Sequence, residues 1–233
     1  MSVADLGRVL VVIPTYNEAE TLEPVVARMR ASVPEADVLV VDDGSPDGTG
    51  DIADRLVAAD PAVHVLHRTE KAGLGAAYIA GFRWALAEGY DVVVEMDSDG
   101  SHAPEELPRL LTALREADLV IGSRWVPGGQ IRNWPLYRQV ISIGGSTYAR
   151  VLLRFPVRRQ VLEELKLDEV ASQGYCFQID LAWKTWRSGF RVREVPITFT
   201  EREVGRSKMS RAIVIEALWR VAGWGLTSRS RSA

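Results

Sequence analysis

The sequence predicts an α/β protein with a mainly parallel central sheet flanked by helices. Short apolar runs typical of buried strands alternate with segments in which apolar residues recur every three or four positions, as on the buried face of a helix. Several of the apolar runs end in carboxylates or Gly-rich turns, and the carboxyl ends of strands are where open α/β sheets bind ligands. A length of 233 residues, 47% of them hydrophobic, provides enough material for one such core.

The first half of the chain carries the clearest alternation. Apolar runs predict strands at 8–13, 38–41, 63–66, 92–96 and 119–121. Helical spacing predicts the intervening helices at 20–31, 50–59, 75–88 and 104–116. A strand, a helix and a second strand in this order form a βαβ unit, which makes the two strands parallel.

The rhythm changes after residue 122. The spacing there predicts helices at 137–153, 175–186 and 211–224, and one strand at 191–200. No internal repeat, low-complexity tract or clear linker interrupts the chain. We therefore expect a single domain whose carboxyl-terminal part is an appendage of helices and a strand.

Asp97 and Asp99, directly after the run at 92–96, are the most informative pair in the sequence. Side chains i and i+2 of an extended chain point to the same side, so the two carboxylates can share one divalent cation. Such a site suits Mg²⁺ or Mn²⁺ on a diphosphate, with most other ligands supplied by substrate oxygens and water. The alternative is a solvated acidic turn, or a helix N-cap before Pro104.

Two further strand ends carry polar loops. The run 38–41 leads into Asp-Asp-Gly-Ser-Pro-Asp-Gly-Thr at 42–49, and the run 8–13 leads into Pro-Thr-Tyr-Asn-Glu at 14–18. Neither loop contains the Gly-x-Gly-x-x-Gly of dinucleotide-binding folds or the Lys-Ser/Thr of P-loops. The sequence therefore argues against a dehydrogenase and against an ATPase.

The formal net charge of −3 conceals two oppositely charged halves. Residues 1–120 contain 9 Lys and Arg against 22 Asp and Glu, whereas residues 121–233 contain 19 against 9. An acidic half suits a metal ion that brings a nucleotide, and a basic half suits a second anion, which could be a phosphate, a nucleic acid or an anionic membrane surface. A chance dipole among solvated faces is the alternative.

The composition also bears on the compartment. Cys176 is the only cysteine, which excludes an intrachain disulfide and fits a reducing compartment. Residues 1–7 lack the basic start and apolar core of a signal peptide, and no run of about 18 uncharged apolar residues predicts a membrane span. We interpret four residues as structural, because no group of cysteines and histidines at zinc-ligand spacing surrounds them: Cys176, His64, His67 and His102.

Six motifs then follow one another along the chain. They are Ile-Pro-Thr-Tyr-Asn-Glu at 13–18, the loop at 41–49, Lys-Ala-Gly-Leu-Gly at 71–75, Asp-Ser-Asp at 97–99, Ile-Gly-Ser-Arg at 121–124 and Arg-Glu-Val-Gly-Arg-Ser-Lys at 202–208. In this order they resemble the motifs of inverting family 2 glycosyltransferases with the Rossmann-like GT-A fold. The stretches at 174–180 and 195–199 further resemble dolichol- and polyprenol-phosphate mannose synthases, in particular the actinobacterial type.

The resemblance covers residues 8–224 and implies a metal-dependent enzyme. Such an enzyme moves mannose from GDP-mannose to a polyprenyl (dolichyl-type) monophosphate, with Mg²⁺ or Mn²⁺ as cofactor and without a nucleic-acid partner. The chain would form one GT-A catalytic domain over 1–233, with a nucleotide-sugar half at 1–122, an acceptor half at 123–210 and a terminal amphipathic helix at 211–226.

The resemblance also implies roles for individual residues. The donor nucleotide would be bound by Pro14, Tyr16, Glu18, Val41, Asp42, Asp43, Lys71, Asp97, Ser98 and Asp99. The lipid phosphate would be bound by Arg124, Arg138 and Ser142, and the catalytic residues would be Asp99, Arg202 and Lys208. The metal ligands would be Asp97 and Asp99. Ser101 stands where many relatives place a glutamine ligand, so the role of Ser101 would be weak or water-mediated.

The lipid tail of the acceptor gives the terminal segment a role. The stretch 213–224 is too short and too charged to span a bilayer, but its tryptophans and arginines suit the membrane interface. We therefore expect a cytoplasmic protein that is peripheral on the cytoplasmic face, held by the membrane surface or by a membrane-spanning partner protein. A helix packed on the domain is the alternative.

One departure and two other functions stay open at this point. Relatives carry a further short segment, with the signature Asp-x-Thr-x-Gly-Phe/Tyr-Arg, where this chain passes from Arg154 to Phe155. Either this chain has truly lost the segment, or the segment is a mobile loop that is missing from the sequence. We favour the second explanation, because a loop over the acceptor site is typically mobile. The other functions are a transferase that uses UDP-glucose or another nucleotide sugar, and a non-catalytic binding subunit. Taken singly, Pro14 could shape a turn, Tyr16 could be a packing aromatic and Arg138 a solvated helix residue.

Overall fold

The computed structural model describes residues 3–101, 103–123, 126–132, 156–165 and 176–200. Its strands are β1 (Val9–Thr15), β2 (Asp37–Asp42), β3 (Val63–His67), β4 (Val92–Glu95), β5 (Leu119–Ser123), β6 (Gln130–Arg132), β7 (Pro156–Arg158), β8 (Val192–Pro196) and β9 (Thr198–Thr200). Its helices are α1 (Leu22–Ser32), α2 (Thr49–Ala59), α3 (Leu74–Ala87), α4 (Leu107–Ala113), α7 (Arg159–Glu164) and α8 (Cys176–Arg187). Single 3-10 turns occur at Val3–Leu6, Pro104–Glu106 and Leu114–Glu116.

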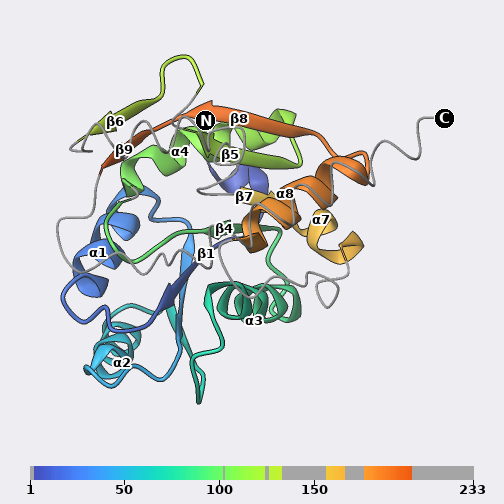
Figure 1. Ribbon diagram of the computed structural model, residues 1–233. Helices are drawn as coiled ribbons and strands as arrows, with labels where there is room; N and C mark the ends of the chain where they lie inside the picture. Colours follow the sequence, from blue (N-terminus) through green and yellow to red (C-terminus); the bar gives the residue numbers. More distant parts are fainter. Residues whose placement is uncertain (1–2, 102, 124–125, 133–155, 166–175, 201–233) are drawn as a thin grey trace.

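Seven of the strands form one sheet in the order β3-β2-β1-β4-β7-β5-β8 (Figure 1). All pairings in this sheet are parallel except those of β7, which runs antiparallel to β4 and to β5. A separate two-stranded sheet pairs β6 with β9. The predicted α/β fold with a mainly parallel central sheet is therefore confirmed.

Alternation along the strands divides the core into two layers. In β1, Val11 and Ile13 pack in the layer of α1, α2 and α4, whereas Leu10 and Val12 pack in the layer of α3, α7 and α8. Figure 1 accordingly shows α1 and α2 on one side of β1 and α3 on the other. Because both faces of the sheet are covered, its strands are continuous apolar runs.

The helix α3 packs closely on β1. A Cβ at Gly81 of α3 would lie 2.5 Å from Val12 Cγ1 of β1, so only glycine allows the helix to approach this far. The same helix carries the chain from β3, at one edge, across to β4 on the other side of β1. The strand order thus reverses at β1, and such a switch point is where open α/β sheets bind ligands at the carboxyl ends of their strands.

The structure differs from the sequence prediction in the second half of the chain. The strand predicted at 191–200 is two strands, because the chain changes sheets at Ile197. The N–H of Ile197 bonds to the carbonyl of Ser123 in the large sheet, and its carbonyl accepts from the N–H of Gln130 in the small one. The elements β6, β7 and α7 were missed, since segments of 3 to 6 residues show too little periodicity to be recognised.

The remaining predicted elements divide into confirmed and undescribed ones. The strands and helices predicted before residue 122 are present, although the helix predicted at 104–116 begins and ends in 3-10 turns. The helix at 175–186 corresponds to α8, while those at 137–153 and 211–224 lie outside the described residues. No helix in the described part combines the length and the apolar character that crossing a membrane requires.

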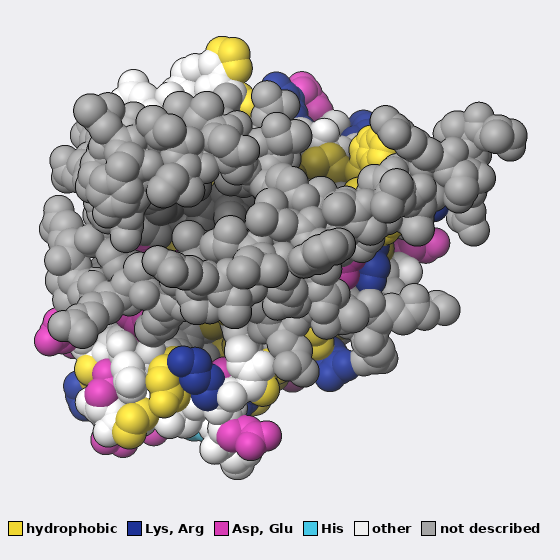
Figure 2. Space-filling view, in the orientation of Figure 1, with side chains coloured by type: hydrophobic (Ala, Val, Ile, Leu, Met, Phe, Trp, Pro, Cys, Tyr) yellow, Lys and Arg dark blue, Asp and Glu magenta, His cyan; other side chains and the backbone are white. Residues whose placement is uncertain are grey.

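Several acidic residues of the first half form ion pairs at the surface. Arg28 pairs with Glu105 at 2.8 Å, and Arg30 pairs with Asp60 at 2.9 Å. Figure 2 shows acidic side chains (magenta) interspersed with Lys and Arg side chains (dark blue) where Figure 1 places α2. The acidic excess of this half is therefore not gathered into one patch on this part of the surface.

Candidate active site

The carboxylates after β4 lie in a tight and mostly buried turn. Asp99 is 8% exposed and Ser98 is 3% exposed, while Asp97 is half-buried. The N–H of Ser101 donates to Asp99 Oδ1 over 2.9 Å, and Ser98 Oγ donates to the carbonyl of Pro14 over 3.4 Å. The second bond joins the loop after β4 to the end of β1, so both sides of the switch point are tied together.

A buried polar cluster lies beneath Asp97. The hydroxyl of Tyr78 in α3 donates to Asp97 Oδ1 over 3.1 Å. Glu95 of β4 is 1% exposed, and its Oε2 accepts from Gln178 Nε2 of α8 over 3.0 Å. Its Oε1 is buried and has no hydrogen-bond partner among the described residues.

Burial changes the protonation of this cluster. It raises the pKa of Glu95 to about 8; the bond from Gln178 opposes this shift and the charge of Asp97 adds to it. Burial, and then the charges of Asp97 and Glu95, hold the pKa of Tyr78 well above its usual value. At neutral pH the Tyr78 hydroxyl therefore remains a hydrogen-bond donor.

The two aspartates at the end of β2 have different surroundings. Asp42 Oδ1 accepts from Thr15 Oγ1 over 3.1 Å and from Ser45 Oγ over 2.6 Å. Asp42 Oδ2 accepts from the N–H of Ser45 over 3.1 Å. The Asp42 carboxylate thus holds the loop after β2, and its predicted contact with the donor stays a prediction.

Asp43 pairs with an arginine that directly follows the neighbouring strand, β3. Asp43 Oδ1 lies 2.6 Å from Arg68 Nη1, and the two side chains are 5% and 19% exposed. Burial raises the pKa of Asp43, and this shift is opposed by Arg68 and by a hydrogen bond from the N–H of Ala72. Gly44 permits this arrangement, because its φ is +68° and a Cβ there would lie 3.3 Å from the carbonyl oxygens of Arg68 and Thr69.

The loops after β1 and β2 brace each other. Three N–H groups of the first loop donate to side chains of the second, from Asn17 to Ser45 Oγ (3.0 Å), from Glu18 to Thr49 Oγ1 (3.0 Å) and from Ala19 to Asp47 Oδ2 (3.1 Å). Asp47 also accepts from the N–H and the hydroxyl of Thr49. Most of the polar residues at 42–49 therefore fix the loops, which leaves Asp43 as the acidic residue directed toward the loop after β3.

Tyr16 and Lys71 meet at the same edge of the sheet. Lys71 Nζ lies 4.0 Å from the centre of the Tyr16 ring, within the range of a cation–π interaction. Tyr16 is half-buried in the loop after β1, and Lys71 is exposed in the loop between β3 and α3. The loops that follow β1, β2, β3 and β4 thus combine one aromatic ring, two cations and several carboxylates.

Asp97 and Asp99 fit the divalent cation that the sequence predicts. The Tyr78 hydroxyl bonds to Asp97, and the charge of Asp99 also raises the pKa of Tyr78, so both carboxylates act on one hydroxyl. In the part of the chain that the structure describes, no group of three or more His, Cys, Asp or Glu could hold a metal ion. Two carboxylates suit Mg²⁺ or Mn²⁺, which keep several waters and take further ligands from substrate phosphates.

The structure brings most of the predicted donor residues to one edge of the sheet. They are Pro14, Tyr16, Glu18, Asp42, Asp43, Lys71, Asp97, Ser98 and Asp99. Val41 differs, because its fully buried side chain packs in the core layer of α3. Ser101 contributes its N–H to Asp99, and its residue is 5% exposed.

The structure does not describe the predicted acceptor residues or the predicted catalytic cations. Arg124, Arg138, Ser142, Arg202 and Lys208 lie outside the described residues, as does His102. Of the residues interpreted as structural, His67 Nε2 lies 2.9 Å from Asp54 Oδ1, and the ring of His64 contacts that of Trp84. Both contacts agree with that interpretation.

Sequence analysis missed four residues of this site. Arg68 and Gln178 bond to partners 25 and 83 positions away in the sequence. A pattern of neighbouring residues does not predict contacts between such distant positions. Tyr78 looks like one more core residue of an apolar helix. Glu95 did carry a signal, because it is the one charge within the apolar run at 92–96.

Comparison with known sequences identifies relatives over nearly the whole chain. Residues 10–178 match the family described as glycosyl transferase family 2. An undecaprenyl-phosphate mannosyltransferase from Micrococcus luteus is 59% identical over 95% of this chain and 96% of its own length. A polyprenol monophosphomannose synthase from Mycolicibacterium smegmatis is 58% identical over 95% of this chain and 88% of its own length.

Solved structures share the fold. A mannosyltransferase from Pyrobaculum calidifontis, in complex with GDP-Man and Mn²⁺, has a TM-score of 0.59 at 22% identity over 86% of this chain and 58% of its own. Glucosyl-3-phosphoglycerate synthase from Mycobacterium tuberculosis, in complex with Mn²⁺, UDP and phosphoglyceric acid, has a TM-score of 0.63 at 23% identity over 94% of this chain and 82% of its own. At these identities the likeness shows the fold alone, which is the GT-A fold that the sequence predicts.

Proposed function

The chain belongs to glycosyl transferase family 2, and on that premise we propose that it transfers mannose from GDP-mannose to a polyprenyl monophosphate with inversion at the anomeric carbon. The observation that carries the proposal is the pair Asp97 and Asp99 at the switch point of the sheet, where Tyr16 and Asp43 follow the carboxyl ends of β1 and β2. Relatives 59% and 58% identical, which are named for mannose and polyprenyl phosphate, support the choice of substrates.

The loops after β1, β2 and β3 would bind the guanine nucleoside. Asp43 would accept hydrogen bonds from the N–H groups of the base, and Arg68 would keep its buried carboxyl charged and oriented. Tyr16 would pack against the nucleoside while Lys71, over its ring, faces the diphosphate. Asp97 and Asp99 would then hold a Mg²⁺ or Mn²⁺ ion at the diphosphate.

The proposed reaction brings two anions together. The cation, when bound, offsets the charge that develops on the leaving diphosphate. A phosphomonoester with a second pKa near about 6 is largely dianionic at neutral pH, so the acceptor oxygen attacks without a protein base. The task of the chain is therefore to supply counter-charges, for which we propose Arg124, Arg138, Arg202 and Lys208. A single displacement on an α-linked donor gives the β-mannosyl product.

A labelled-lipid assay tests the proposal. The full chain would be incubated with Mg²⁺ or Mn²⁺, polyprenyl phosphate and, in parallel reactions, labelled GDP-mannose, UDP-glucose and UDP-N-acetylglucosamine. We expect labelled lipid in the reaction with GDP-mannose and in neither reaction with a UDP-sugar, and we expect none in excess chelator. Label from UDP-glucose would identify a different donor, and no lipid product from any of them would favour a binding subunit.

We further propose that the protein works as a peripheral protein on the cytoplasmic face of the membrane, through the segment 211–226 or through a membrane-spanning partner. Basic and Trp-containing segments bind anionic lipid surfaces by both charge and apolar contact. Flotation of the full chain with vesicles, with and without anionic lipid, measures the first route. If the chain floats with neither kind of vesicle, a membrane-spanning partner is the remaining route to the membrane.

A further inference from the structure

The hydroxyl of Tyr78 is buried directly against the carboxylate of Asp97. Tyr78 is 1% exposed, and its hydroxyl donates to Asp97 Oδ1 over 3.1 Å. Building on the function proposed above, we propose that Tyr78 is a positioning residue that orients Asp97 for the divalent cation of the donor diphosphate. The bond fixes one carboxylate oxygen and therefore the direction in which the carboxylate faces.

The hydroxyl of Tyr78, rather than its ring, requires this explanation. Phe82, one turn further along α3, fills the same core layer with a ring that has no polar atom. A buried hydroxyl is unfavourable unless it makes a hydrogen bond, so packing alone would favour phenylalanine at both positions. The acceptor that the hydroxyl finds is a proposed cation ligand.

The helix α8 holds the parts of this arrangement in place. The ring of Phe177 stacks on that of Tyr78, with centroids 6.1 Å apart and planes inclined by 5°. The next residue, Gln178, donates to Glu95 Oε2. Adjacent residues of one helix thus fix both side chains beneath Asp97. Because α8 belongs to the half proposed to bind the acceptor, the cluster links that half to the cation ligands.

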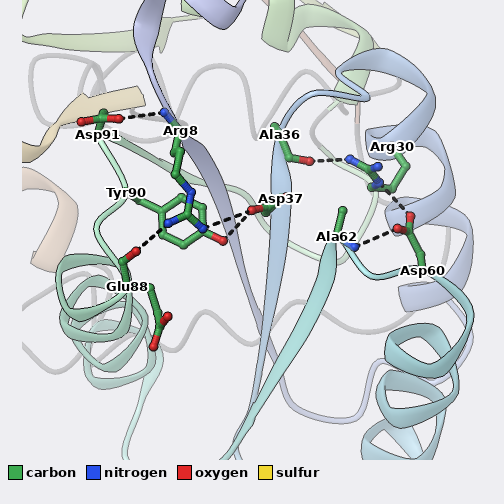
Figure 3. Close-up of polar contacts among 9 residues, drawn as sticks. All are labelled: Arg8, Arg30, Ala36, Asp37, Asp60, Ala62, Glu88, Tyr90 and Asp91. Carbon is green, nitrogen blue, oxygen red and sulfur yellow. Dashed lines mark hydrogen bonds and ion pairs between the residues drawn. The ribbon is translucent and has the colours of Figure 1, made fainter.

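The chain offers a matched control at the end of the sheet opposite to the candidate site. Tyr90 is also 1% exposed, and its hydroxyl donates to Asp37 Oδ2 over 2.6 Å. Figure 3 shows this pair with the Arg8 guanidinium over the Tyr90 ring, at the amino-terminal ends of the strands. Tyr90→Phe removes the same kind of buried bond as Tyr78→Phe, but far from the proposed cation ligands.

The test is a titration of the full chain with Mn²⁺ in the presence of GDP, in which free Mn²⁺ is followed by electron paramagnetic resonance. We expect Tyr78→Phe to raise the Kd for Mn²⁺ about tenfold or more, as is typical when a partner of a metal ligand is lost. Tyr90→Phe should leave the Kd within about twofold of the wild type, because distant sites act independently. Phe177→Leu, which keeps the hydroxyl but removes the stacked ring, should raise the Kd by a smaller factor.

The outcomes separate this inference from the proposed function. If the wild type binds Mn²⁺ and Tyr78→Phe binds it equally well, the positioning role is overturned and the proposed function stands. An equal loss in Tyr90→Phe overturns the positioning role too, since the effect is then general. If Tyr78→Phe does not fold, an unchanged Kd in Phe177→Leu has the same meaning. No binding of Mn²⁺ by the wild type overturns the cation assignment itself.

Discussion

Arg68 Nη1 lies 2.6 Å from Asp43 Oδ1, and this ion pair joins the carboxyl ends of β3 and β2 where the proposed nucleotide site begins. The Asp43 side chain is 5% exposed, so its carboxylate has little water to stabilise its charge. Burial, and to a lesser extent the charge of Asp42, raises the pKa of Asp43, and Arg68 is the largest influence that opposes this rise. Arg68 therefore controls whether Asp43 is available as a charged acceptor.

The first prediction replaces Arg68 by methionine. We expect Arg68→Met to raise the Kd for GDP about tenfold, because a buried carboxylate that loses its ion-pair partner becomes protonated or changes its orientation. Calorimetric titration with GDP measures the effect. Arg28→Met is the matched control, since it breaks an exposed pair with Glu105. Equal GDP affinity in the wild type and Arg68→Met would show that Asp43 does not contact the nucleotide.

A second prediction concerns the pair after β4. Asp99→Ala should abolish transfer and Asp97→Ala should be nearly as damaging, because one remaining carboxylate cannot position the cation on the diphosphate. The measurement is formation of the lipid product, with circular dichroism to verify folding. Asp51→Asn, which removes an exposed carboxylate from α2, is the control. Normal turnover by Asp99→Ala, or by the wild type in excess chelator, would contradict the assignment.

The sequence was sufficient to predict the features that depend on local chemistry and local periodicity. The run Val38 to Val41 is continuously apolar because both faces of the sheet are covered: Val38 and Val40 pack in one core layer, and the other two residues of the run pack in the opposite layer. Asp97 and Asp99 directly follow a strand, as the apolar run before them indicates, whereas their sharing of one cation stays a prediction. Such features depend on neighbours within a few positions, so a single sequence contains them.

The sequence was insufficient where a role depends on distant partners. Asp42 and Asp43 are adjacent and chemically identical, yet Asp42 receives bonds from Thr15 and Ser45 whereas Asp43 receives them from Arg68. The strand β7 has only 3 residues, and its place between β4 and β5 follows from tertiary pairing. The burial of Glu95 next to Asp97 likewise depends on α8, which lies far along the chain.

The contact between Lys71 and Tyr16 gives a third prediction. Tyr16→Leu should raise the Kd for GDP about two- to fivefold, because a cation–π pair at a partly exposed site is worth roughly 0.5–1 kcal/mol. Tyr16→Phe keeps a ring beneath Lys71 Nζ and should bind GDP as the wild type does. Calorimetric titration of both variants provides the comparison. An equal loss in both would assign the effect to the hydroxyl instead of the ring.

The fourth prediction concerns cations outside the described residues. Arg202→Ala and Lys208→Ala should lower kcat far more than they weaken donor binding, because their charges are needed only when the two phosphates converge. Arg138→Ala should mainly raise the KM for polyprenyl phosphate. A charge-assisted phosphate contact is worth about 1.5–3 kcal/mol, so each loss should be roughly ten- to a hundredfold. Steady-state kinetics for both substrates and GDP-mannose titration measure this. Normal kcat with lost donor affinity would instead place the cluster in the donor site.

The buried carboxyl of Glu95 makes stability depend on pH. Its pKa is raised from an ordinary value of 4.5 to about 8, first by burial and also by the charge of Asp97. Between these two values the folded chain keeps a proton that the unfolded chain releases. The unfolded state then binds fewer protons, so the free energy of unfolding falls as the pH rises through this window.

The fifth prediction is therefore that Glu95→Gln stabilises the protein at alkaline pH. The amide cannot ionise and can still accept from Gln178, so the gain should be small below pH 4.5 and largest above pH 8. Since one pKa unit corresponds to about 1.4 kcal/mol, the gain should reach a few kcal/mol at most. Urea unfolding in chelator at both pH values measures it, with the exposed Glu88→Gln as control. A difference between Glu95→Gln and the wild type that does not change with pH would mean that Glu95 is already ionised in the folded chain.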